Sequence, residues 1–413
     1  MAGPRILYVS SAIGLGHLSK DLAIAEQVRA LRPDAELLWL AGHPSSDALA
    51  EAGEAVLPEA AGWRGATDIL EQMTARGQMD LVDYAYRSMP AWLHNMRIVR
   101  RAAAAYDADI AVGNEAWELF IPLISRILRL TIPLVMITDF MGMKAARPAA
   151  VDRLKAYGLN ALWALDWTAF GPRRRHSVIF IGEPEDIADE SMGLGLPNRR
   201  EYVIRHYDFL GHVLRFDPAA FADRANWRTK RGYGGEPLVI CSVGGTTIGR
   251  ELLQLCADAV VPLRERVPDA HVVLVCGPRI ATDTLTVPTG VDVRGYVPRL
   301  YEHHACCDVA VGQCGASSTT ELMALGTPFI YFPIEGHYEQ ELVAARLQRY
   351  GAGARLSLAD TTPEMLAEAI AAAYARGVEP VPLPVDGARR AAEHIVGTLD
   401  RGRSTTGERT PAQ

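Results

Sequence analysis

The sequence lacks three features that would each point to a particular class of protein. It has no excess of basic residues, since 42 lysines and arginines against 49 aspartates and glutamates give a formal net charge of −7, whereas nucleic-acid binders present a basic face. No apolar stretch approaches the roughly 18 residues that a transmembrane helix requires. Residues 1–10 lack the basic-then-apolar pattern of a signal peptide. We therefore expect a cytoplasmic protein without nucleic-acid partners, and peripheral contact with the inner membrane surface stays open.

Cysteine is also sparse, with six residues in 413. Most of the six lie within apolar stretches that have the periodicity of strands or helices, which predicts buried free thiols. His303-His304 stands next to Cys306-Cys307, but adjacent residues point to different faces of a helix and do not form a metal site. The sequence thus predicts no metal and no other cofactor.

What the sequence does contain is a repeated order of strand, glycine loop and helix. A predicted strand at Arg5–Ser10 leads through a glycine loop into a helix from His17, and a strand at Glu36–Leu40 follows. The order restarts with a strand at Pro237–Ser242 and a second glycine loop. With 49% hydrophobic residues the chain can form two cores. This order predicts an α/β protein with two Rossmann-like, doubly wound parallel-sheet domains facing across a cleft.

Composition and periodicity also predict where the domains end. Residues 63–104 are predicted to be mostly helical, as packing elements or as a lid over an acceptor. The predicted segments are an N-terminal domain (1–205), a linker (206–236), a C-terminal domain (237–385), a C-terminal helix (386–400) and a disordered tail (401–413).

A small-residue motif, GQCGASSTTELMALGTP at residues 312–328, follows a predicted strand and opens a predicted helix. Such a turn directs free backbone N–H groups and the positive helix end at a ligand, which suits phosphate. A second glycine loop, Gly244-Gly245-Thr246, also follows a strand. Together the two loops are suited to a diphosphate. Their backbone amides and hydroxyls would stabilise the negative charge of the diphosphate without a metal ion.

Five motifs in order carry a resemblance to a known family. They are Gly14-Leu15-Gly16-His17, Ser242–Thr247, Gly295-Tyr296-Val297-Pro298, the 312–328 motif and Glu339-Gln340. On these the chain resembles GT-B nucleotide-sugar glycosyltransferases, and is similar to MurG-type N-acetylglucosaminyl transferases and to antibiotic- and plant-tailoring UDP-sugar transferases. The resemblance is strongest over residues 236–350, whereas residues 60–105 and 140–205, where acceptor choice would lie, fall outside it.

The resemblance implies that the N-terminal domain (1–205) binds the acceptor and the C-terminal domain (237–385) binds the nucleotide-sugar donor. It also implies roles for individual donor-site residues. Glu321 would bind the ribose diol, Tyr296 would stack on the base where tailoring enzymes usually have tryptophan, and Val297 would contact the base edge. Gln313 replaces the histidine of tailoring enzymes and the arginine of MurG-type chains, so that backbone and hydroxyl groups would carry more of the phosphate binding. The full implied donor set is Gly244, Gly245, Thr246, Thr247, Tyr296, Val297, Gln313, Gly315, Ala316, Ser317, Ser318, Thr319, Glu321 and, for sugar hydroxyls, Glu339 and Gln340.

His17, at the end of the acceptor loop Gly14, Leu15 and Gly16, is the candidate general base. The resemblance implies deprotonation of an acceptor hydroxyl, for which imidazole has a suitable pKa; acceptor binding and a structural role stay open. Glu115 and Asp139 each follow a predicted strand, where site residues gather in this fold. Asp139 is the slightly favoured partner for His17, and Glu115 is an alternative base.

The resulting hypothesis is a metal-independent, inverting glycosyltransferase. It would move the sugar of a UDP- or dTDP-sugar donor to the hydroxyl of a natural-product or lipid-linked acceptor. Two alternatives stay open: a UDP-N-acetylglucosamine 2-epimerase, and a catalytically silent partner subunit that binds nucleotide sugars. The sequence predicts neither the sugar nor the oligomeric state.

Overall fold

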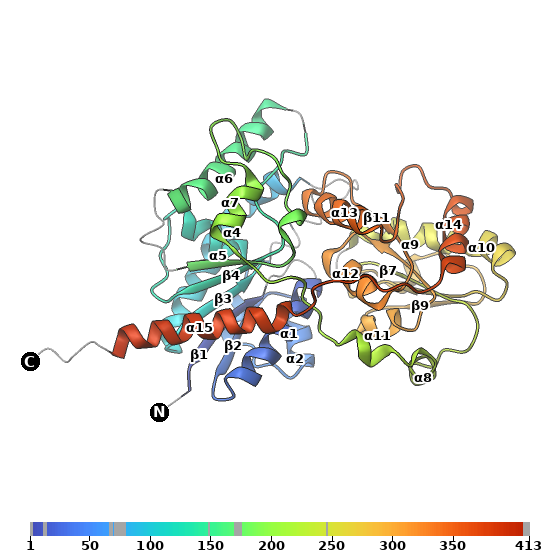
Figure 1. The fold of residues 1–413 in the computed structure, drawn as a ribbon, viewed down its shortest axis with the longest axis horizontal. Coiled ribbons are helices and arrows are strands. Elements are labelled where there is room, and N and C mark those ends of the chain that lie inside the picture. Colours follow the sequence, from blue (N-terminus) through green and yellow to red (C-terminus); the bar gives the residue numbers. More distant parts are fainter. Residues whose placement is uncertain are drawn as a thin grey trace, which may run out of the picture. The chain divides into compact units, whose positions relative to one another are not determined.

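The computed structural model describes residues 3–10, 15–65, 69, 80–147, 149–168, 176–244 and 247–407. They form two compact units (Figure 1). The first unit contains the residues up to Arg215 together with those from Pro384 onward, and the second contains Phe216–Leu383. Each unit is built on its own sheet.

The described part of the first unit contains a six-stranded sheet in the order β2-β1-β3-β4-β5-β6, with every neighbouring pair parallel. Its strands are apolar along almost their whole length, because helices cover both faces of a parallel sheet. The strands are β1 (Arg5–Ser10), β2 (Glu36–Ala41), β3 (Ile110–Asn114), β4 (Leu134–Thr138), β5 (His176–Phe180) and β6 (Asp208–Phe209).

Two helices of the first unit, α4 and α7, begin at a residue whose side chain caps the helix. Asp80 accepts hydrogen bonds from the amides of Val82 and Asp83, and Asn198 caps a later helix in the same way. The helices are α1 (Leu15–Leu31), α2 (Ser45–Glu51), α4 (Leu81–Ala105), α5 (Trp117–Ile124), α6 (Ala150–Thr168), α7 (Arg199–His206) and α15 (Gly387–Gly407).

The second unit contains, in its described part, a six-stranded parallel sheet in the order β12-β11-β10-β7-β8-β9. Helices α9, α10 and α14 pack on one face, and α11, α12 and α13 on the other. The strands are β7 (Leu238–Ser242), β8 (His271–Val275), β9 (Val291–Arg294), β10 (Val309–Gln313), β11 (Phe329–Phe332) and β12 (Ala354–Arg355). The helices are α8 (Arg224–Lys230), α9 (Arg250–Asp258), α10 (Val260–Arg266), α11 (Leu300–His304), α12 (Ala316–Leu325), α13 (Tyr338–Tyr350) and α14 (Pro363–Arg376). The two predicted parallel-sheet domains are confirmed.

The structure divides the chain differently from the predicted boundaries at two places. Residues 206–236, predicted as a linker, supply β6 to the first sheet and α8 to the second unit, where Arg224 and Arg228 pair with Asp308. The C-terminal helix, predicted for 386–400, continues to Gly407, so residues 401–407 of the predicted tail are helical. Residues 408–413 lie outside the described part.

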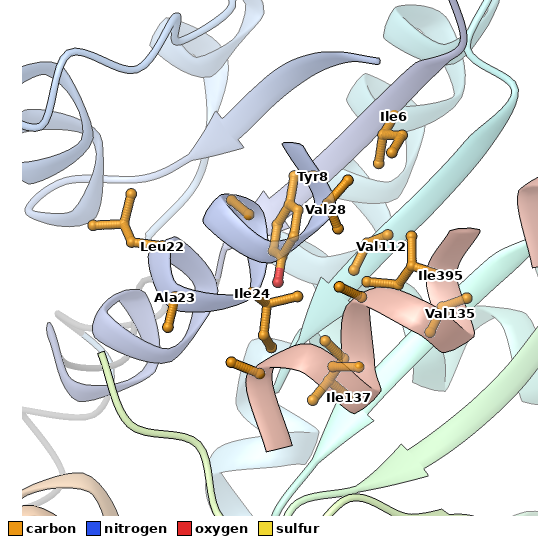
Figure 2. Close-up of a cluster of buried hydrophobic side chains, with 14 of the residues drawn as sticks. Ile6, Tyr8, Leu22, Ala23, Ile24, Val28, Val112, Val135, Ile137 and Ile395 are labelled. Atoms are coloured by element: carbon orange, nitrogen blue, oxygen red, sulfur yellow. The ribbon is translucent and has the colours of Figure 1, made fainter. Parts of the chain in front are cut away.

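Helix α15 returns to the first unit and completes its core. Figure 2 shows Ile395 beside Val112 and Val135 of the central strands and near Ile24 and Val28 of α1. Two segments almost 370 residues apart in the chain therefore cover the same face of the sheet.

We expect Ile395→Val to lower the free energy of unfolding by about 0.5–1.5 kcal/mol, the usual cost of removing one buried methylene. Ile395 is fully buried, whereas Ile204 on α7 is 53% exposed. Ile204→Val is therefore the matched control and should change stability by less than about 0.5 kcal/mol. Urea unfolding followed by circular dichroism measures both. Equal effects would show that α15 is not held in this core.

Candidate functional site

Each sheet has one position at which the strand order reverses, and ligands of open α/β sheets bind beyond the carboxyl ends of the strands at that position. In the first sheet it lies between β1 and β3, and in the second between β7 and β10. His17 and Glu115 follow β1 and β3, while Gly244 and Gly315 follow β7 and β10. These four predicted site residues thus follow the strands that flank the two topological switch points.

In the second unit, the loop that follows β7 contacts the last residue of β10 and the loop that follows β8. The amide of Gly244 donates a long hydrogen bond of 3.5 Å to Oε1 of Gln313. Gly277, after β8, has a φ of +73°, and a Cβ added there would lie 2.9 Å from the carbonyl oxygen of Gly244. The close approach requires glycine at Gly277. Gly245 and Thr246 lie outside the described residues.

The N-terminus of α12 lies at this switch point and has no side-chain cap. Gly315 is its N-cap residue, and a Cβ added there would meet no described atom within 4 Å. The first-turn amides have no acceptor within the helix and carry the positive end of its dipole. Ser317 and Ser318 in that turn are half-buried. Backbone and hydroxyl donors are therefore placed for an anion.

Two further hydroxyls of the motif have a different role. The hydroxyl of Thr319 donates to the carbonyl of Gly315 at 2.8 Å, and that of Thr320 donates to Ala316 at 2.7 Å. Both side chains are buried. The hydroxyl-rich pattern of the sequence therefore separates into an outer pair, Ser317 and Ser318, and an inner pair that stabilises the first turn of α12.

Other predicted donor residues lie at the ends of neighbouring elements. Tyr296 follows β9 and is 41% exposed, which leaves its ring accessible to a ligand, and Val297 packs against the core. Glu321 on α12 and Glu339 on α13 are half-buried. Gln340 is buried, and its Oε1 accepts a hydrogen bond of 2.7 Å from the amide of Ile334. The side-chain carbonyl of Gln340 thus supports the loop between β11 and α13.

In the first unit, the structure brings together charged groups from three elements. Nζ of Lys20 on α1 lies 2.5 Å from Oδ2 of Asp139, which follows β4. The amide of Asp139 donates to Oε1 of Glu115, which follows β3, at 2.7 Å. Glu115 is buried and has a left-handed backbone, with φ of +47°. Asp139 and Glu115, predicted as alternatives, are direct neighbours.

A second network fixes the start of α1. Asp21 is fully buried and accepts hydrogen bonds from the hydroxyls of Ser10 at 2.5 Å and Tyr8 at 3.2 Å. Burial raises the pKa of Asp21 to about 7, although these hydrogen bonds oppose the shift. Nδ2 of Asn114 donates to the carbonyl of His17 at 3.4 Å. This network ties the first turn of α1 to β1 and β3.

His17 is half-buried at that first turn. Its Nδ1 is buried and, among the residues the structure describes, has no hydrogen-bond partner. The pKa of His17 is lowered to about 4, first by burial and then by the Lys20 ammonium, while the Asp139 carboxylate opposes both effects. The imidazole is therefore neutral near pH 7 and able to accept a proton. Of the predicted acceptor loop, Gly14 lies outside the described residues, the side chain of Leu15 is not described, and Gly16 is half-buried in α1.

Sequence reasoning did not assign Lys20, Asp21 or Asn114 to the site. A signal was present, because Lys20 and Asp21 follow His17 by three and four residues and share its face of α1. Asp21 also lies among the apolar residues of that helix. A charged pair on the buried face of a helix indicates partners from elsewhere in the fold.

Comparison with known proteins identifies the domain that carries the second switch point. Residues 239–380 match the glycosyltransferase family 28 C-terminal domain, and this range includes every predicted donor residue. A UDP-N-acetylglucosamine–N-acetylmuramyl-(pentapeptide) pyrophosphoryl-undecaprenol N-acetylglucosamine transferase of Clavibacter michiganensis is 26% identical over 84% of this chain and 82% of its own length. The chain is a GT-B nucleotide-sugar glycosyltransferase.

Other relatives agree with this assignment. An uncharacterized glycosyltransferase of Methanopyrus kandleri is 28% identical over 46% of this chain, and the match spans 54% of that relative. Among solved structures, the kitacinnamycin glycosyltransferase has a TM-score of 0.58 at 18% identity, covering 98% of this chain and 99% of its own. The glycosyltransferase SnogD of Streptomyces nogalater has a TM-score of 0.56 at 15% identity, covering 98% and 99%. These structures share the fold of the enzyme.

Three further features of the glycosyltransferase concern its cysteines, its potential metal ligands and the membrane. All six cysteines are free and buried, as predicted. Within the described ranges, one group of potential metal ligands lies together, formed by Glu183, Asp186 and His212 in the first unit. There Asp186 accepts from the amide of Glu183 and caps a short 3₁₀ helix. None of the described helices has the length and apolar character needed to span a bilayer.

Proposed function

We propose that this glycosyltransferase moves a sugar from a UDP- or dTDP-sugar to an acceptor hydroxyl by direct displacement, with inversion at the anomeric carbon. The observation that carries the proposal is the pair of switch points. One presents the uncapped N-terminus of α12 for a leaving diphosphate, and the other presents a neutral imidazole, His17, as the base.

The donor class rests on the chemistry of the second unit and on what related proteins bind. The Clavibacter relative is named for a UDP-sugar donor, and a spinosyn rhamnosyltransferase of the same fold was solved with thymidine diphosphate. In this chain the exposed ring of Tyr296 would stack on the base, and the carboxylate of Glu321 would accept hydrogen bonds from the ribose. Glu339 and the side-chain amide of Gln340 would contact the sugar hydroxyls.

Charge that develops on the leaving diphosphate would be stabilised by the α12 dipole, the first-turn amides and the hydroxyls of Ser317 and Ser318. The side chain of Gln313 is already within reach of the Gly244 amide. The Gln313 side chain would therefore help to orient the glycine loop. Because this side chain is neutral, it adds no positive charge to the site.

The acceptor hydroxyl must lose its proton as the new bond forms. His17 is the favoured base, because Glu115 is 3% exposed and accepts the Asp139 amide, whereas His17 is half-buried and neutral. The acceptor would be a natural product or a lipid-linked sugar. A cytoplasmic location, peripheral at the inner membrane surface for a lipid-linked acceptor, belongs to the same proposal.

A ligand panel tests the proposed function. UDP and dTDP should raise the thermal unfolding midpoint in a concentration-dependent way, since a ligand that binds only the folded state stabilises it by mass action. ADP and GDP serve as controls and should shift it less. Release of nucleoside diphosphate from a donor sugar should then require an acceptor. Conversion of UDP-N-acetylglucosamine to its C2 epimer without an acceptor would favour the epimerase alternative. The absence of any nucleotide shift would contradict the proposal.

We also expect transfer activity to persist in excess EDTA. The glycine loops of the second unit offer amides and hydroxyls, and neither contains an Asp-x-Asp pair that would hold a divalent cation beside a diphosphate. The initial rate with and without EDTA is the measurement. Loss of activity that Mg²⁺ or Mn²⁺ restores would show that a metal, and not the loops alone, stabilises the leaving group.

A further inference from the structure

The ion pair between Lys20 and Asp139 is unusual because both side chains are almost completely buried. Their exposed fractions are 5% and 4%, and Nζ and Oδ2 are 2.5 Å apart. Removing two charges from water carries a desolvation cost that the attraction between them does not always exceed. A contribution to stability is therefore a weak explanation for this ion pair. The position of the pair beside His17 suggests a role in the reaction instead.

Lys20 follows His17 by three residues on α1, so the two side chains share one face of the helix. Lys20 and Asp139 are the charged groups that act on the imidazole. Asp21 on α1 and Glu115 after β3 are in turn the neighbours of Lys20 and Asp139. Asp21 is held by Ser10 and Tyr8, and Glu115 accepts the Asp139 amide. The Asp139 carboxylate, in turn, is bound by Lys20 while Nδ1 of His17 stays without a partner among the described residues.

We propose that Lys20 is a positioning residue of the transfer reaction: its ammonium group binds Asp139 in the buried ion pair and thereby keeps that carboxylate from becoming the hydrogen-bond partner of His17. The inference rests on the proposed role of His17 as base. Its consequence is that His17 stays unprotonated well below neutral pH. The enzyme then retains an active base in mildly acidic solution, where an imidazole paired with a carboxylate would be largely protonated.

The direction of the expected change follows from the charges. Lys20 lowers the pKa of His17 and Asp139 raises it. Burial is the largest cause of the lowered pKa and persists in Lys20→Met. That variant removes the second lowering cause and frees the carboxylate, so both effects raise the pKa of His17 from about 4 toward its ordinary value of about 6.5. The pH below which kcat/KM falls, its acid limb, should rise together with the pKa of His17. Lys20→Arg keeps the positive charge, so the acid limb of kcat/KM should stay at the low pH of the wild type.

Titration of His17 by NMR tests the inference without reference to activity. In protein labelled with ¹³C,¹⁵N-histidine, the His17 signal is assigned by its loss in His17→Gln. We expect an upward shift of at least about one pH unit in Lys20→Met and less than half of that in Lys20→Arg. A wild-type His17 that titrates near pH 6.5, or an unchanged titration in Lys20→Met, would overturn the inference.

The pH profile of kcat/KM separates this inference from the proposed function. An acid limb that follows the NMR titration in all variants supports both. A shifted titration with an unshifted limb would show that His17 is not the base, and so overturn the role in transfer on which the inference rests. Should Lys20→Met fail to fold because it leaves a buried carboxylate unpaired, Lys20→Met/Asp139→Asn removes both charges and carries the same test. That variant should show a smaller upward shift, because the carboxylate that raises the pKa is gone.

Discussion

Replacing His17 with alanine is expected to lower kcat by roughly 10²- to 10⁴-fold, the usual contribution of a positioned general base. The binding of a nucleoside diphosphate should hardly change, because the donor loops belong to the second unit and His17 to the first. A residue that acts only in the transition state lowers kcat and kcat/KM together. The expected result is therefore a loss of turnover without a loss of donor affinity.

Steady-state kinetics in both substrates, with calorimetric titration of the nucleoside diphosphate, measure this separation. His43→Ala is the matched control, since His43 also lies in the first unit but its side chain is 68% exposed; that variant should keep wild-type rates. A higher acceptor KM with kcat intact would make His17 an acceptor ligand and leave Glu115 or Asp139 as the leading base. Loss of folded protein with normal residual specific activity would give His17 a structural role.

Replacing Glu321 with alanine is expected to weaken nucleoside diphosphate binding by roughly 1–3 kcal/mol, or about 5- to 150-fold in Kd, because charge-assisted hydrogen bonds to the ribose are lost. Glu321 is half-buried near the start of α12, so the fold should persist. Glu368→Ala is the control, because Glu368 is an exposed glutamate on α14 of the same unit.

The ribose itself provides the decisive comparison for Glu321. Calorimetry with UDP and with 2′,3′-dideoxy-UDP measures what the ribose hydroxyls contribute to binding. In the wild type their removal should cost affinity, whereas in Glu321→Ala it should cost little, since their partner is already absent. A folded variant that binds UDP as the wild type does would remove Glu321 from the site.

Local patterns in the sequence were sufficient for much of the fold. Apolar stretches of strand length, followed by glycine loops and helical periodicity, predicted β1, β2, β7 and the start of α1 to within two residues. The positions of glycine loops after strands predicted where anion-binding amides would lie. This prediction is possible because a tight turn depends on residues that are neighbours in the sequence. The uncapped start of α12 at Gly315 is such a local feature.

Contacts between distant segments were decided by the tertiary structure alone. Lys20 and Asp139 are 119 residues apart and meet because β1 and β4 flank β3 in the sheet. Thr319 resembles Ser317 and Ser318 in sequence, but the packing of α12 turns its hydroxyl inward to Gly315. Periodicity shows that a residue faces a core without showing which chain segment lies opposite.

The sequence by itself therefore determined the two α/β domains and their glycine loops, because turn geometry and helix starts depend on residues close together in the chain. The candidates His17 and Glu321 came from the family resemblance of the motifs. The tertiary structure decided that α15 joins the first unit, through Ile395, and that Lys20 is the partner of Asp139. Strand order and helix docking bring such groups together, and both depend on burial summed over the whole fold, which no short segment encodes.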